Sequence, residues 1–146
     1  MNGSAASPTA PTSQPSTSAT PADLTFCVAE TNSRRATIGK ANLTQSPALE
    51  AFAADGARID HGTSVPHTHF SSVNGGGVAA AENELHRFLF ASFGTVRIAI
   101  MQMIAVFWAE GLTGEHYQTI AGPYQQLGCG IYIGADGGIT IVQDFR

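Results

Sequence analysis

Residues 126–145, QLGCGIYIGADGGITIVQDF, decide the fold of this chain. Apolar side chains recur at alternate positions in 127–134 and again in 138–145, which is the period of a β-strand. The intervening Ala-Asp-Gly-Gly sequence is typical of a tight turn. We therefore expect a C-terminal β-hairpin. Four side chains of its first strand would share one buried face: Leu127, Cys129, Ile131 and Ile133.

Three segments earlier in the chain show the apolar spacing of helices. The first covers residues 24–38, and the second follows the N-cap pair Ser46-Pro47 and extends to residue 60. The third, TVRIAIMQMIAVFWAEG at 95–111, starts with a capping threonine, ends at a glycine and is apolar on nearly every face, so we expect it to be central. Helices early and strands late predict an α+β fold in which helices cover a small sheet.

Three other segments are less regular. Residues 61–77 are rich in His and Gly and predict a loop, whereas residues 78–90, VAAAENELHRFLF, fit either a helix or a strand. Residues 1–22 are mainly Ser, Thr, Ala and Pro, without a charged or aromatic side chain. They cannot bury enough apolar surface to offset the entropy of ordering. We expect a flexible tether over 1–22 and one folded domain over 23–146.

The chain carries few charges, at 12% of 146 residues, and its net charge is −4. Nucleic acid and anionic membrane surfaces are therefore disfavoured as partners, because phosphate binding needs a basic patch. No run reaches the 18 or so apolar residues of a membrane span. The first residues also lack the basic and apolar regions of a secretion signal. If the protein is exported, we expect this sequence to be a trimmed form that has lost a signal or anchor.

Two cysteines, Cys27 and Cys129, allow one pairing. They are either two buried free thiols or a disulfide that closes a loop of roughly 100 residues and contributes up to about 4–5 kcal/mol in the chain-entropy model. An exported location favours the disulfide. Cys129 lies among apolar strand residues, which suits an inert sulfur and not a nucleophile.

The histidines are the groups best suited to chemistry: His61, His67, His69, His86 and His116. In an extended loop, His67 and His69 would project to the same side and, with a third ligand, hold zinc. Their spacing equally fits a solvated loop. Carboxylates beside imidazoles shift each other's pKa, so Glu82 or Glu84, Glu110 and His116 are candidates for acid/base work.

The order of several short motifs resembles a known family. They are, from the N-terminal end, ETNSRRATIG, SPALEAFAADGARI, HTHF, AENE, VFWAEG, EHYQTI, LGCGIYI and ITIVQDF. Over about 120 residues this series is similar to the CAP superfamily, named after cysteine-rich secretory proteins, antigen 5 and pathogenesis-related 1 proteins. Ala81 stands where the family has a glycine, and two cysteines replace several. The missing cysteines and the short loops indicate a bacterial extracellular or surface form.

The resemblance implies an α-β-α sandwich with a central antiparallel sheet, and a cleft with two histidines and two glutamates. Carried over, these are His116, Glu110, Glu82 and either His69 or His67, of which the neighbouring Phe70 favours His69. In the family such histidines bind zinc or another divalent cation. We therefore expect metal ligation by His69 and His116, with His67 as the alternate to His69.

Three functions remain open at this point. The first is an extracellular or surface-tethered binding module, without catalysis, for a small molecule, lipid, glycan or protein. The second is a peptidase-like hydrolase that uses Glu82, Glu110 and His116 with a metal-activated water. The third is a purely structural role, in which the polar cluster satisfies its own hydrogen bonds between helix and sheet.

Overall fold

The structure is a computed structural model, and it describes residues 18–146. Helices and strands follow one another in the order α1 Pro21–Ala36, β1 Thr44–Gln45, α2 Pro47–His61, α3 Thr68–Val73, the 3-10 turn η1 Asn74–Gly77, β2 Ala81–Leu89, η2 Phe90–Ser92, α4 Val96–Ala109, η3 Gly111–Thr113, α5 Glu115–Ile120, β3 Gln126–Ile133 and β4 Gly138–Phe145.

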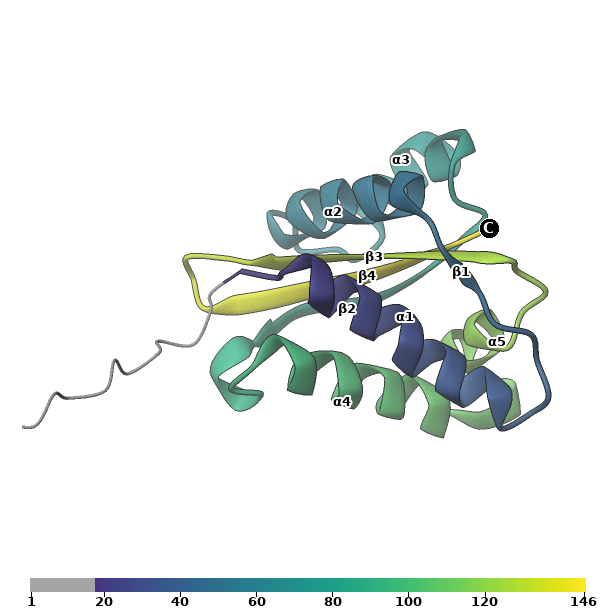
Figure 1. Cartoon of the computed structure of the whole chain (residues 1–146). Coiled ribbons are helices and arrows are strands. Elements are labelled where there is room, and N and C mark those ends of the chain that lie inside the picture. The colour runs from purple at the N-terminus through teal and green to yellow at the C-terminus, as the bar shows by residue number, and fades with distance from the viewer. Residues whose placement is uncertain (1–17) are drawn as a thin grey trace, which may run out of the picture.

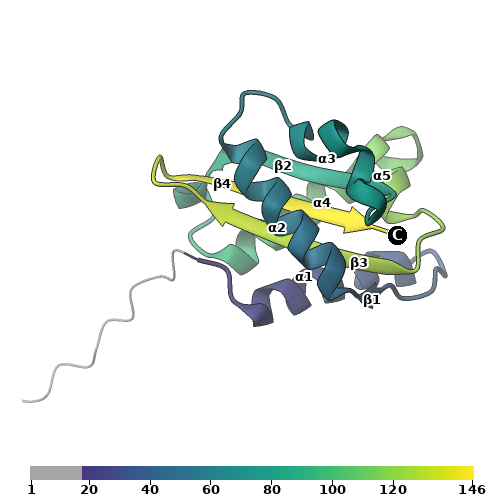
Figure 2. The ribbon, with the colours of Figure 1, turned by 90° about the horizontal axis from the view of Figure 1, so that it is seen from above.

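These elements form three layers (Figures 1 and 2). A sheet with strand order β1-β3-β4-β2 lies in the middle, with α2 and α3 on one face and α1, α4 and α5 on the other. The predicted α+β class and sandwich are confirmed. The long strands pair antiparallel as expected, but the two-residue β1 runs parallel to β3, so the sheet as a whole is mixed.

The predicted C-terminal hairpin is confirmed. β3 and β4 pair from Leu127 opposite Phe145 to Ile133 opposite Ile139, and the chain turns at Gly137, whose φ of 82° suits glycine. The four side chains predicted to share a face all contact one apolar core. That core fills the space between the sheet and the α1–α4 layer.

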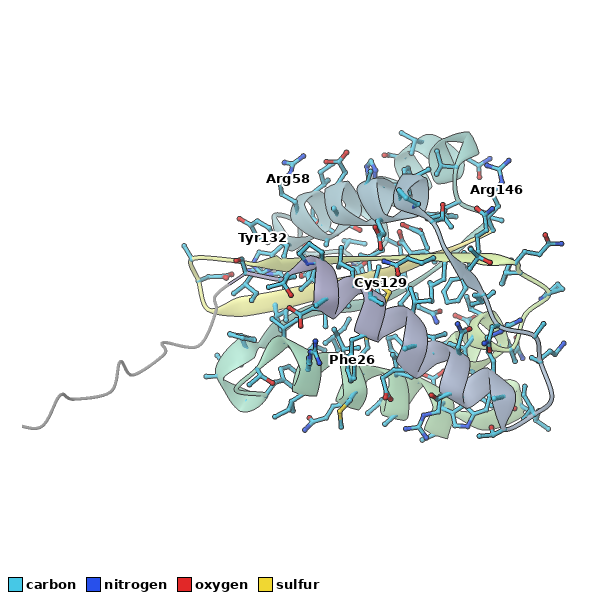
Figure 3. The ribbon with its side chains drawn as sticks, viewed as in Figure 1. Phe26, Arg58, Cys129, Tyr132 and Arg146 are labelled. Carbon is cyan, nitrogen blue, oxygen red and sulfur yellow. A yellow bond between two sulfur atoms is a disulfide. The ribbon has the colours of Figure 1, made fainter. Side chains whose placement is uncertain are left out.

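A disulfide fastens the two ends of the described domain. Cys27 of α1 and Cys129 of β3 are joined, with their Cα atoms 6.5 Å apart, and both residues are fully buried. Figure 3 shows Cys129 between the sheet and α1. Of the two alternatives left open by the sequence, the structure therefore contains the disulfide.

The opposite face of the sheet is packed much more tightly. A Cβ atom at Gly128 would lie 2.2 Å from the backbone nitrogen of Glu50, and one at Gly130 would lie 2.1 Å from the carbonyl carbon of Ala53. The backbone of α2 therefore rests directly on β3. Only glycine leaves room for this approach.

Two residues of the first-helix motif act as fasteners. The buried guanidinium of Arg35 donates to three backbone carbonyls, those of Ala41, Ile120 and Gly122, over 2.7–2.9 Å. Asn32 exchanges two hydrogen bonds with the backbone of Leu43. Together they fix the segment after α1 and the end of α5.

Three predictions about the irregular segments need correction or completion. Residues 61–77 are not a continuous loop, because α3 forms there. Buried carboxylates satisfy backbone N–H groups at its start: His67 N donates to Glu84 Oε2 at 2.5 Å, and His69 N donates to Asp60 Oδ1 at 2.7 Å. The ambiguous segment 78–90 contains strand β2.

The start of α1 also differs from the prediction. The helix begins at Pro21, three residues before the expected start at residue 24 and two before the expected domain boundary at residue 23, because Thr20 and Asp23 form a reciprocal capping box. The expected tether over 1–22 therefore extends too far at its C-terminal end, and its residues 1–17 lie outside the described part of the chain.

Candidate functional site

The candidate site lies where β2 begins. α3 and α5 lie on opposite sides of this end of the sheet (Figure 1). Successive side chains of a strand point to opposite faces, so Glu82 and Glu84 share one face of β2 and Asn83 points to the other. Asn83 Nδ2 donates to the carbonyl oxygen of His116 at 3.2 Å, which fixes α5 beside the strand.

The first half of the site is a His–Glu pair between α3 and β2. His67 Nδ1 lies 2.7 Å from Glu82 Oε1 and 3.7 Å from Glu84 Oε2. The His67 side chain is 37% exposed, whereas those of Glu82 and Glu84 are 2% and 0% exposed. The hydrogen bond to Glu82 raises the pKa of His67, against the effect of burial. The partly exposed His67 ring therefore lies between solvent and the buried carboxyl groups of Glu82 and Glu84.

The second half is a His–Glu pair between α4 and α5. Glu110 caps the end of α4, and its carboxylate lies 2.6 Å from His116 Nδ1 and accepts the backbone N–H of His116 at 3.1 Å. The imidazole stacks on Phe107 with ring centroids 4.0 Å apart. One carboxylate and one aromatic ring thus fix the orientation of a partly exposed imidazole.

The four residues carried over from the resemblance thus form two separate His–Glu pairs, and His67 occupies the first of them. His69 forms no hydrogen bond with Glu82. Its ring packs on Phe52 with the ring centroids 4.7 Å apart, and its Nε2 is buried without a hydrogen-bond partner among residues 18–146. His67 has a left-handed backbone, with φ of 60°. In the extended loop expected from the sequence, the side chains of His67 and His69 would project to the same side. The left-handed turn at His67 changes their relative directions.

One group in the described residues has three ligand atoms within 4.8 Å of one another: His67, Glu82 and Glu84. His116, Glu110 and His69 do not belong to it. Glu84 was not among the residues assigned to the predicted cleft. Its position two residues after Glu82 would have placed both carboxylates on one face if the segment had been recognised as a strand.

Two further buried acids adjoin this group. Asp144 lies opposite Glu82 in the β2–β4 ladder and is 0% exposed, as is Asp60 at the end of α2. Burial, followed by the charge of Glu82, raises the pKa of Asp144 to about 9. Burial raises the pKa of Glu84 to about 8, although the His67 backbone N–H opposes the shift. This acidic cluster could not be predicted from the sequence, because it depends on the register of β2 against β4.

The other two histidines have structural partners. His61 Nδ1 lies 2.9 Å from Thr140 Oγ1, and its Nε2 lies 2.9 Å from Asp136 Oδ1 in the hairpin turn. His86 Nε2 donates to the carbonyl oxygen of Asp60 at 2.8 Å. Both rings therefore fasten α2 to the sheet.

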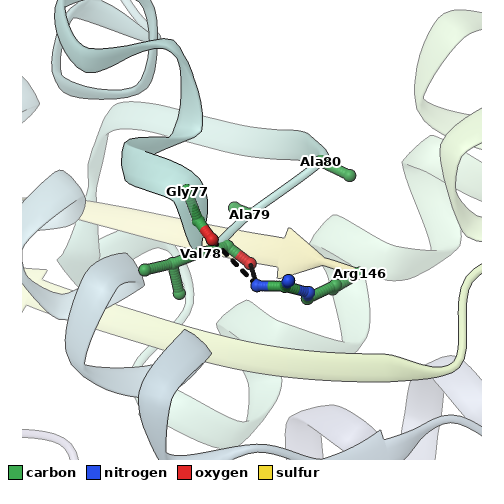
Figure 4. Close-up of a pocket in the computed structure, with 5 residues that line it drawn as sticks. All are labelled: Gly77, Val78, Ala79, Ala80 and Arg146. Atoms are coloured by element: carbon green, nitrogen blue, oxygen red, sulfur yellow. Dashed lines mark hydrogen bonds between the residues drawn. The ribbon is translucent and has the colours of Figure 1, made fainter.

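Two surface pockets lie outside this cluster. An apolar pocket of about 250 Å³ between β2, η2 and α4 is lined mainly by Phe88, Phe93, Met103, Val106 and Phe107. A second, of about 220 Å³, lies beside Arg146, whose guanidinium donates to the carbonyl oxygens of Gly77 and Val78 (Figure 4). The guanidinium that lines the second pocket is therefore already hydrogen-bonded to the backbone.

None of the helices within residues 18–146 has the length and apolar character needed to cross a membrane. Comparison of the sequence with protein-family models and with curated proteins found no match.

Proposed function

We propose that this chain is an extracellular or surface-tethered binding module of the CAP type, and that its cleft holds a divalent cation. The observation that carries the proposal is the pair of His–Glu contacts at one end of the sheet, His67 with Glu82 and His116 with Glu110. Asn83, next to Glu82, binds the backbone of His116, so both pairs border the same strand.

The chemistry of the site fits a cation. Imidazole and carboxylate are ligands of zinc and of other first-row divalent ions. Glu82 Oε2 and Glu84 Oε1 are buried without a hydrogen-bond donor among the described residues. Burial raises the pKa of Glu84, so this carboxyl keeps a proton in the metal-free protein, and a cation would displace that proton and pair with the carboxylate.

Two features support the rest of the proposal. The disulfide is typical of proteins from oxidising compartments, which supports an extracellular location. The apolar pocket beside Phe88 and Val106 would accept the apolar part of a small molecule or lipid. The proposed ligand is therefore a partly apolar molecule, bound on a module that also carries a cation.

The test is the metal content of the full chain purified without chelator, with the variants His67→Ala and His69→Ala. We expect about one equivalent of divalent metal in the wild type and in His69→Ala, and loss of metal in His67→Ala. A wild-type protein that neither retains metal nor binds added Zn²⁺ would exclude the proposed cation site.

A metal-assisted hydrolase is a second candidate, favoured by one observation. Glu110 orients His116 through Nδ1, so Nε2 is left as a base on an imidazole that is 31% exposed. If the protein is a hydrolase, His116→Ala should abolish turnover of a peptide library. Turnover that is unchanged in this variant would eliminate the hydrolase.

A further inference from the structure

The His67, Glu82 and Glu84 side chains converge closely enough for one metal ion to replace the His67–Glu82 hydrogen bond. Ligand atoms about 2.1 Å from a tetrahedral ion lie about 3.4 Å apart. His67 Nδ1 is 2.7 Å from Glu82 Oε1 and 3.7 Å from Glu84 Oε2, and all three atoms lie within 4.8 Å of one another. Small movements of side chains, without movement of the backbone, would complete the geometry.

A second observation points to a missing partner at the same place. Six buried side-chain atoms in residues 18–146 have no hydrogen-bond partner. Five are carboxyl oxygens of the acidic cluster, namely Asp60 Oδ2, Glu82 Oε2, Glu84 Oε1 and both oxygens of Asp144, and the sixth is Nε2 of His69, whose backbone N–H binds Asp60. Buried polar atoms are normally paired, so such exceptions need an explanation. A proton shared between Asp144 and Glu82, which the raised pKa of Asp144 permits, satisfies two of these atoms, and the others are open to a group from outside the chain.

Capping of α3 does not account for these atoms. Glu84 uses Oε2 to accept the His67 backbone N–H, and Asp60 uses Oδ1 to accept that of His69. In both residues the other oxygen remains without a donor. A neutral amide could accept either backbone N–H, so capping alone does not explain why ionisable carboxyl groups occupy these two buried positions.

His116, the second histidine that the resemblance assigns to the site, already has other partners. His116 Nδ1 contacts Glu110, and the ring stacks on Phe107. It contributes no atom to the group whose ligand atoms lie within 4.8 Å. Glu84 takes the third position in that group.

We propose that the cation is held by His67, Glu82 and Glu84, a set of one imidazole and two carboxylates on a single strand and its neighbouring turn, and not by two histidines. This inference rests on the proposed function, since it assigns the ligands of the cation in the same cleft. A mixed imidazole–carboxylate set selects the first-row divalent ions from Mn²⁺ to Zn²⁺. Mg²⁺ and Ca²⁺ prefer sites made of oxygen ligands alone, so the imidazole disfavours them relative to Zn²⁺.

The test is calorimetric titration of the metal-free full chain, disulfide intact, with Zn²⁺, Mn²⁺ and Mg²⁺. Glu84→Gln keeps the size of the side chain and an oxygen that accepts the His67 N–H, but removes the charge. Glu30→Gln, on α1 in the opposite layer, is the matched control. His116→Ala removes the second histidine. Thermal unfolding without metal checks that each variant is folded.

We expect Glu84→Gln to weaken Zn²⁺ and Mn²⁺ binding by more than about 100-fold, since even outer-shell partners typically contribute about 10- to 100-fold. Glu30→Gln should bind as the wild type does, His116→Ala should lose less affinity than Glu84→Gln, and Mg²⁺ should bind more weakly than Zn²⁺. Loss of binding in His116→Ala with unchanged binding in Glu84→Gln would overturn this ligand set but leave the cation-binding module in place. Absence of Zn²⁺ and Mn²⁺ binding by the wild type would overturn both.

Discussion

At the scale of single residues, the buried carboxyl groups determine how this protein responds to pH. Glu84 and Asp144 lie in the interior, and burial raises their pKa values to about 8 and about 9. In the unfolded chain both groups titrate near pH 4. Between these limits the folded protein holds protons that the unfolded chain has released. The free energy of unfolding must therefore fall as the pH rises.

We predict that the metal-free protein loses stability steadily from pH 5 to pH 8. Each group that binds a proton only in the folded state contributes about 1.4 kcal/mol per pH unit. His67, whose pKa is also raised, acts in the same direction above its usual pKa. Asp23 and Asp136 have lowered pKa values and matter only in more acidic solution. Urea unfolding in the presence of EDTA measures this slope.

The control for this prediction is Glu84→Gln, which removes one of the two buried titrating carboxyls and should reduce the slope by about half. Stability that is constant or that rises between pH 5 and pH 7 would contradict the predicted protonation of both groups.

The residues of the site differ in how far the sequence could predict them. Three of them lie in short motifs that resemble those of CAP proteins, so the sequence singles out each one: Glu82, Glu110 and His116. The choice between His67 and His69 depends on a left-handed turn at His67, which no local pattern indicates. Asp144 meets Glu82 through strand register, and Asp60 meets α3 through the end of a different helix. Contacts between residues so far apart in the chain cannot be predicted from a short stretch of sequence.

At the scale of elements, the backbone of α2 approaches that of β3 very closely at Gly128 and Gly130. The Cβ that Gly130→Ala would add would lie within 2.2 Å of the Ala53 backbone, which cannot move without shifting α2. Overpacking of this kind typically costs about 1–3 kcal/mol, and occasionally more. We predict a loss of at least about 2 kcal/mol in the free energy of unfolding, measured with urea.

The facing helix offers a matched control in Gly56→Ala. There the new Cβ would have its nearest neighbours at 3.6–3.9 Å, an ordinary contact distance. Alanine is also about 1 kcal/mol better than glycine within a helix, so this variant should be as stable as the wild type or more stable. Equal losses in the two variants would show that the close approach at Gly130 is not the cause.

The elements were predictable where their signals are local. Thr95 and Ser46 cap α4 and α2 as expected, and the alternation within 127–145 predicts the hairpin. α3 was missed because it has six residues and its start is satisfied by Glu84 and Asp60, which come from distant parts of the chain. Isolated helices of that length are not stable in water, so its sequence alone carries little helical signal.

At the scale of the whole molecule, the two faces of the sheet have different roles. The α1–α4 face encloses the larger apolar core, including Ile100, Ile104 and Phe107. The α2–α3 face has only a small apolar cluster around Val142 and carries the buried acids. Apolar burial is therefore concentrated on one face of the sheet, and the buried acids Asp60, Glu84 and Asp144 lie on the other.

The disulfide links the α1 layer to the sheet across a sequence separation of 102 residues. A loop of that length restricts the unfolded chain by about 4–5 kcal/mol in the chain-entropy model, while removal of native disulfides typically costs about 2–5 kcal/mol. We predict a loss in this range for Cys27→Ala/Cys129→Ala, measured by urea unfolding at pH 6 against the oxidised wild type. The wild type reduced with dithiothreitol is the control, because it loses the same constraint but keeps both sulfur atoms in the core. A loss below about 1 kcal/mol in both would mean that packing of α1 on α4, and not the covalent link, holds this layer on the sheet.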